Sequence, residues 1–89
     1  MNRYGRAAQQ HWQTMRPLQY AQINDPTGFF TRLGETMASQ IIELSHSMAG
    51  DDTTGETYLQ KLGRLRTARL RAEEQILRET LPPSEPTAN

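Results

Sequence analysis

The sequence contains no cysteine, no long apolar run and no excess of charge of either sign. Without cysteine the chain can form no disulfide, no thiolate zinc site and no cysteine nucleophile, and this absence fits a cytoplasmic protein. No apolar window approaches the roughly 18 residues that a membrane span needs. The charges in residues 1–6 have no hydrophobic region behind them, unlike those of a signal peptide. We therefore expect a cytoplasmic protein that does not enter a membrane.

Positive and negative charges cancel, because ten lysine and arginine residues balance ten aspartate and glutamate residues. A neutral total argues against a DNA mimic and against a general polycationic binder, although local patches remain open. The 89 residues suffice for one domain with a modest core. We expect a single helical domain over residues 1–81 and, by composition, a disordered tail over residues 82–89.

The strongest pattern is a long amphipathic helix between Asp25 and Gly50. Asp25 is a favourable N-cap residue, and Pro26 suits the first helical position because its missing N–H would be unpaired there. Gly50 stands where a left-handed residue commonly ends a helix. The apolar positions fall within an arc of roughly 120°. They are Phe29, Phe30, Leu33, Met37, Ile41, Leu44 and Met48.

Two further helices are predicted on either side of this central helix. The first covers residues 3–16 and ends before Pro17, because proline disfavours helical geometry in the preceding residue. A short helical connector then leads to the central helix. The third helix should run from about Thr54 to Thr80, with Thr53 and Glu56 forming a capping box. Its apolar positions are Tyr58, Leu62, Leu65, Ala72 and Ile76, widened on one side by Leu59, Leu70 and Leu77.

Two long helices joined by a short polar turn favour an antiparallel hairpin, because this arrangement buries both apolar stripes. We therefore predict an all-α fold. In detail, we expect a small three-helix bundle built on the long hairpin and closed by the short, bent N-terminal helix.

Five residues carry more specific expectations. Arg69 and Glu73 stand four residues apart on the third helix, so an ion pair at the edge of the core is expected. The alternative partners of Arg69 are Glu35 and Glu43 across the hairpin. Trp12 shares an apolar face and is expected in the core. Gly34 lies beside the apolar arc and predicts a close helix approach, whereas Gly63 points outward and no packing explains it.

No convincing catalytic or ligand-binding group of residues is present. Glu43 and His46 have the spacing seen in di-metal carboxylate bundles, but they fall on the solvent side and no second copy occurs. His11 flanks the apolar face of the first helix and fits a boundary residue better than a general base. Nucleophile elbows, phosphate-binding glycine loops and zinc-spaced ligands are absent from the sequence. We expect a non-enzymatic protein with no metal and no cofactor.

An arginine ridge is the most informative surface feature. The chain carries five cations and no acid from Lys61 to Arg71, and Arg64, Arg71 and Arg78 repeat every seven residues. Such a row can contact phosphates or an acidic protein surface, while a solvated helix face is the alternative. The predicted partner-binding residues are Lys61, Arg64, Arg71 and Arg78.

Short sequence elements stand near both ends of the chain. They are Tyr4-Gly5-Arg6, Trp12 and Arg16-Pro17-x-x-Tyr20 near the start, and Ala72-Glu73-Glu74-x-x-Leu77 with Glu79 near the end. In order and spacing they resemble the small transposon-encoded proteins called TnpV, whereas residues 25–30 do not align. The resemblance implies a gene carried on transposons, integrative elements or phages, and it implies no catalytic residues. It also groups Tyr4 with Arg6, Arg16 and Tyr20, which either brace the fold or form a second partner surface.

We hypothesise a non-enzymatic interaction protein, encoded by a mobile element, that binds another protein. The partner would belong to the element's own machinery or to a host defence complex, which the protein would inhibit. The alternative is a nucleic-acid-binding accessory or regulatory protein that uses the arginine ridge. Zero net charge and the nearby Glu74 and Glu79 argue against that alternative.

The leucine flank of the third helix, formed by Leu59, Leu70 and Leu77, favours a two-fold homodimer. The competing expectation is a monomer in which the connector covers this flank. The connector residues that would do so are Leu18, Tyr20 and Ile23.

Overall fold

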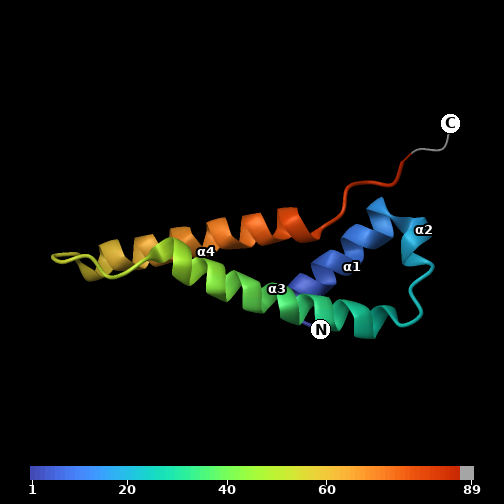
Figure 1. Ribbon diagram of the computed structural model, residues 1–89, viewed down its shortest axis with the longest axis horizontal. Helices are drawn as coiled ribbons and strands as arrows, with labels where there is room; N and C mark the ends of the chain where they lie inside the picture. The colour runs from blue at the N-terminus through green and yellow to red at the C-terminus, as the bar shows by residue number, and fades with distance from the viewer. Residues whose placement is uncertain (87–89) are drawn as a thin grey trace.

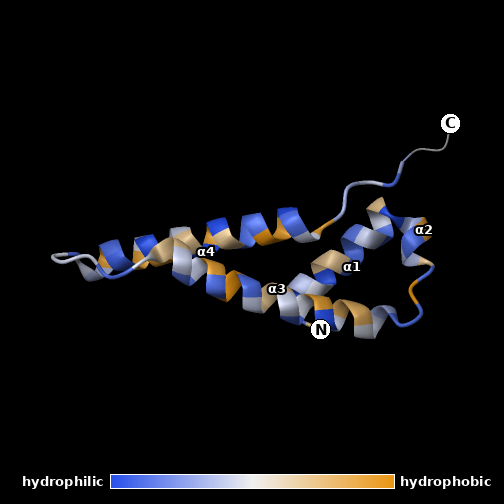
Figure 2. Ribbon diagram, in the orientation of Figure 1, coloured by the Kyte–Doolittle hydropathy of each residue, from blue (hydrophilic) through white to orange (hydrophobic). Residues whose placement is uncertain are grey.

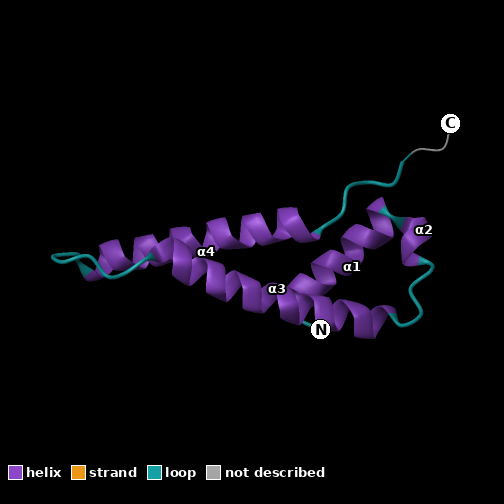
Figure 3. Cartoon of the chain, viewed as in Figure 1, coloured by secondary structure: helices purple, strands orange, loops and turns teal. Residues whose placement is uncertain are grey.

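Four α-helices make up the fold in this computed structural model, which describes residues 1–86. They are α1 (Arg3–Met15), α2 (Pro17–Tyr20), α3 (Pro26–Ala49) and α4 (Tyr58–Thr80). No strand occurs within these residues (Figure 1 and Figure 3). The fold is therefore all-α, as the helical periodicity predicts.

Both ends of α3 follow local capping chemistry. The backbone N–H of Gly28 donates to Oδ1 of Asp25 at 3.1 Å, and Pro26 occupies the first helical position. Gly50 ends the helix with φ at 68°, a conformation that glycine adopts without the steric cost of a side chain. The predicted limits of the central helix are confirmed.

The start of α4 differs from the prediction. The capping box of Thr53 and Glu56 is wrong, because α4 begins only at Tyr58. The N–H of Gln60 donates to Oγ1 of Thr57 at 3.1 Å, and the N–H of Thr57 donates to Oε1 of Gln60 at 2.9 Å. The Glu56 carboxylate is instead bound by a guanidinium further along α4, so it does not serve as a cap.

The helices form an elongated body of 58 × 30 × 16 Å. α3 packs against both α1 and α4, and α1 lies in the wedge between α3 and the C-terminal part of α4 (Figure 1). The core collects where α1 meets the α3–α4 hairpin. Its buried members are Tyr4, Ala8, Phe30, Met37, Ile41, Ala72 and Ile76.

An aromatic cluster fastens α1 and α2 to the start of α3. Trp12 meets Phe29 and Phe30 edge-on, with ring centroids 5.9 and 6.0 Å apart. The Tyr20 ring stacks on Phe30 at 6.0 Å. Such aromatic pairs contribute beyond their buried area. The expectation that Trp12 packs in the core is confirmed.

This cluster also decides where the connector goes. Tyr20 packs beside Phe30, and Leu18 of α2 is exposed, so the connector does not cover the leucine flank of α4. The expectation that the connector fills this flank is wrong. The reason is that the stacking of Tyr20 on Phe30 holds α2 beside the N-terminal part of α3.

Most apolar side chains in the N-terminal part of α4 are exposed to solvent. Leu59 is 78% exposed and Leu70 is 61% exposed, and hydrophobic segments continue along α4 toward the tip of the hairpin (Figure 2). Three predicted core positions are wrong because they are exposed: Tyr58, Leu62 and Leu65. The physical reason is that α3 ends at Ala49 and α1 covers only the other end of the hairpin, so no third helix covers this half.

The chain after α4 runs across the far end of α1 without regular secondary structure. His11 Nε2 lies 2.6 Å from the carbonyl oxygen of Pro82, and the N–H of Glu85 donates to the carbonyl of Met15 at 2.9 Å. Glu85 also accepts from the backbone N–H of Gln19 at 2.9 Å. The predicted tail over residues 82–89 is thus held against α1 and α2 through residue 85, and residues 87–89 lie outside the described part.

Candidate protein-binding surface on the hairpin

Arg64, a predicted partner-binding residue, is anchored inside the turn between α3 and α4. Its Nε lies 2.8 Å from Oε2 of Glu56, and its Nη2 lies 2.9 Å from Oδ1 of Asp52. The guanidinium also donates to the backbone carbonyl of Ala49. Because the side chain is only 22% exposed, Arg64 closes the hairpin turn and is not available to a partner.

Two other ridge cations also face acids of the same chain. Lys61 Nζ lies 2.7 Å from Asp52, and Arg78 Nη2 lies 2.8 Å from Glu74. Within residues 1–86, the exposed Arg71 side chain forms no ion pair and no hydrogen bond. The ridge therefore offers one free cation where the sequence predicts four.

Acidic side chains of the turn are stabilised in their charged form. The hydrogen bond from Arg64 is the main reason that the pKa of the Glu56 carboxyl lies below its usual value. The hydrogen bond from Lys61 likewise lowers the pKa of the Asp52 carboxyl. This charge-assisted network gives the turn a defined shape without a hydrophobic core.

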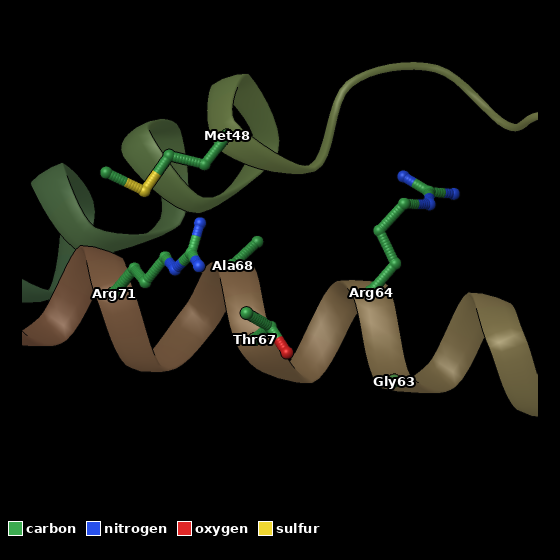
Figure 4. A pocket seen from close by; sticks show the side chains of 6 residues that line it. All are labelled: Met48, Gly63, Arg64, Thr67, Ala68 and Arg71. Atoms are coloured by element: carbon green, nitrogen blue, oxygen red, sulfur yellow. The ribbon is translucent and has the colours of Figure 1, made fainter.

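A groove of about 410 Å³ opens beside Arg71, between α3 and α4 (Figure 4). It is lined by Met48, Gly63, Arg64, Thr67, Ala68 and Arg71. The side chains of Met48 and Arg71 reach into the space between the two helices, whereas Arg64 points toward the turn (Figure 4). The groove thus combines an apolar thioether with a free guanidinium, which suits a carboxylate flanked by apolar groups.

A second hollow lies further along the α3–α4 hairpin. It has a volume of about 350 Å³ and is lined by Glu43 and Leu44 of α3 and by Gln75 of α4, among others. Gln75 stands one turn beyond Arg71, and Leu44 stands one turn before Met48, so the two hollows open on the same side of the α3–α4 hairpin.

The second predicted surface is not assembled as one site. Arg16 donates to the carbonyl of Pro83 at 2.7 Å, and the Tyr20 hydroxyl accepts from Gln9 and Gln13 at 3.1 and 3.0 Å. Both side chains therefore brace the fold. Arg6 lies ten residues before Arg16, about 15 Å along the axis of α1, and donates to the carbonyl of Met1.

Hydrogen bonds and ion pairs to the Glu73 carboxylate join α1 to α4. Arg69 Nε lies 3.1 Å from Glu73, which confirms the predicted ion pair. The Tyr4 hydroxyl donates to the same carboxylate at 2.8 Å, and Arg3 also contacts it. Tyr4 and Glu73 both belong to the elements that carry the family resemblance. The sequence shows no signal for their pairing, because α1 and α4 meet only through the fold.

Burial and hydrogen bonding shift the pKa of the Glu73 carboxyl in opposite directions. Partial burial alone would raise the pKa of its carboxyl, but the hydrogen bonds from Tyr4 and Arg69 and the charge of Arg3 outweigh burial. Its pKa in the folded protein therefore lies below the usual value.

We expect the folded protein to lose stability in acid. A carboxyl whose pKa is depressed by folding stabilises the folded state above its unfolded pKa of about 4.3. That contribution disappears as the pH falls through the lower, folded value. Thermal unfolding should therefore change little between about pH 8 and pH 6 and become easier below about pH 4. Circular dichroism at a series of pH values measures this.

Glu73→Gln is the matched variant for the pH experiment. It should unfold more easily than the wild type near pH 7 and differ less from it near pH 3. An unfolding midpoint that falls equally in both proteins would show that Glu73 does not contribute to the acid response.

Glu43 and His46, spaced like the ligands of a di-metal site, do not join a larger ligand cluster within residues 1–86. Both side chains are exposed, and residues 1–86 contain no group of three or more side chains that could hold a metal ion. No helix among these residues is long and apolar enough to cross a membrane. Comparisons with protein-family models, curated proteins and solved structures find no match.

Proposed function

We propose that this protein is a non-enzymatic, cytoplasmic interaction protein of a mobile genetic element that works by binding another protein. In this proposal α1, α3 and α4 act as one three-helix bundle that presents the groove of Figure 4. The observation that carries the proposal is the free guanidinium of Arg71 beside the exposed Met48. The resemblance to TnpV proteins supports the mobile-element context. The partner would be element machinery or a host defence complex, the latter implying inhibition.

The local charge balance favours a protein partner over nucleic acid. Lys61, Arg64 and Arg78 each face a carboxylate, so a phosphate would have to compete with acids already in place. Nucleic-acid binding normally uses several free cations. Each cation that neutralises a phosphate of duplex DNA makes the slope of log K against log salt steeper by about 0.9. One free ridge cation suits a single acidic side chain of a protein better than a phosphate backbone.

The test is co-purification from the native host with a tagged chain. Arg71→Glu should reduce recovery of the partner by roughly tenfold or more, because it replaces an attractive charge with a repulsive one. Arg32→Glu on α3 makes the same charge change on an exposed residue away from the groove, so it should bind normally. Arg64 is left unchanged because it closes the turn.

Equal recovery with Arg71→Glu and the wild type would overturn the groove as the contact surface. A mobility-shift titration at low salt examines the nucleic-acid alternative. We expect no complex at roughly micromolar protein, since most of the ridge charge is neutralised. A complex that weakens steeply with salt would favour the alternative instead.

A further inference from the structure

The outer side of α4 carries a second apolar line that the described chain leaves partly uncovered. Leu59 and Leu70 are largely exposed, and Leu77 lies seven residues after Leu70 in a partly buried position. Positions 59, 63, 66, 70, 73 and 77 alternate steps of four and three, the spacing at which one helix packs along another. The three leucines hold positions 59, 70 and 77 of this series, and the others hold glycine, arginine and the glutamate that pairs with Arg69. The glycine at position 63 leaves open space, with no atom within 4 Å of an added Cβ.

The charges along α4 are divided between its two halves. Residues 58–71 carry five cations and no acid, whereas residues 72–80 carry three acids and one cation. A second α4 running antiparallel would place each cationic half against an acidic half. The helix is therefore complementary to a reversed copy of itself, which favours a second copy of this chain over an unrelated partner.

We propose that two copies of this chain associate through α4, antiparallel about a two-fold axis near Leu70. This register places Leu70 against Leu70 of the second copy and Leu77 over the gap at Gly63. Arg66 then faces Glu74 of the second copy. Arg66 forms no ion pair within residues 1–86, and the pair between Glu74 and Arg78 is open to solvent, so both side chains can turn toward the interface.

This interface shares Gly63 with the lining of the groove of the proposed function, but Arg71 and Met48 lie outside it. Leu70 and Arg71 are consecutive and therefore point about 100° apart around the helix. Self-association thus goes beyond the proposed function and does not depend on it. Arg71→Glu should leave the mass of the particle unchanged even if it abolishes partner binding.

Sedimentation equilibrium on the whole chain tests the proposal directly. We expect the wild type to shift from one-chain to two-chain mass with concentration, with the dimer prevailing at about 50 µM. Leu70→Glu puts two carboxylates together at the axis and should weaken association by roughly a hundredfold. Leu18→Glu on α2, also a change at an exposed leucine, should keep the wild-type behaviour.

A charge exchange tests the register. Arg66→Glu and Glu74→Arg should each weaken association, and the double variant should restore it, because the opposite charges then face each other again. Circular dichroism confirms that each variant is folded. One-chain mass for the wild type at about 50 µM would overturn the dimer. Failure of the double variant to recover would overturn the antiparallel register.

Discussion

Replacing Phe30 with alanine is expected to destabilise the protein by about 3–5 kcal/mol. Phe30 is completely buried, and its ring contacts those of Trp12, Tyr20 and Phe29. These neighbours come from α1, α2 and α3, so the cavity cannot close without moving several helices. A chain of 89 residues has a total stability of about 4–13 kcal/mol. The substitution therefore removes a large share of it.

Urea unfolding measures this loss, with fluorescence of Trp12, the only tryptophan, as the signal. Phe29→Ala is the matched control because Phe29 belongs to the same cluster but is only partly buried. We expect it to cost about 1–2 kcal/mol, since part of its ring already meets water. Equal losses in the two variants would contradict the view that Phe30 is the centre of the cluster.

Replacing Gly34 with alanine is expected to destabilise the protein by about 1–3 kcal/mol, although alanine is the better helix former. An added Cβ would meet the side-chain oxygen of Asn2 and would lie 2.7 Å from the backbone nitrogen of Gly5. Backbone atoms cannot rotate away, so α1 would have to shift. The predicted close approach at Gly34 is thus confirmed, and α1 is the helix that makes it.

Gly63→Ala is the matched control, because it makes the same change in the middle of a helix. No atom lies within 4 Å of an added Cβ at that position, so alanine should stabilise by about 0.5–1 kcal/mol. Denaturant unfolding at low protein concentration measures both variants without a contribution from association. A loss at Gly63 or a gain at Gly34 would contradict the packing described for α1 and α3.

Features that depend on one helical turn follow from the sequence alone. Asp25 and Pro26 start α3 and Gly50 ends it, while Arg69 pairs with Glu73 one turn away. Each of these interactions joins residues at most four positions apart, so its geometry is set by the helix itself. The all-α class follows for the same reason, because the apolar periodicity already requires helices.

The candidate surface on the hairpin was decided by contacts between segments that are separated in the sequence. The heptad spacing predicts an arginine ridge, but only the folded turn brings Glu56 and Asp52 to Arg64 and leaves Arg71 free. The pairing of Tyr4 with Glu73 likewise depends on how α1 enters the wedge between α3 and α4. The spacing of apolar and charged residues in the sequence shows which side of a helix is apolar and which is charged. Which segment meets that side depends on helix lengths and on how the turns close, and these are properties of the tertiary structure.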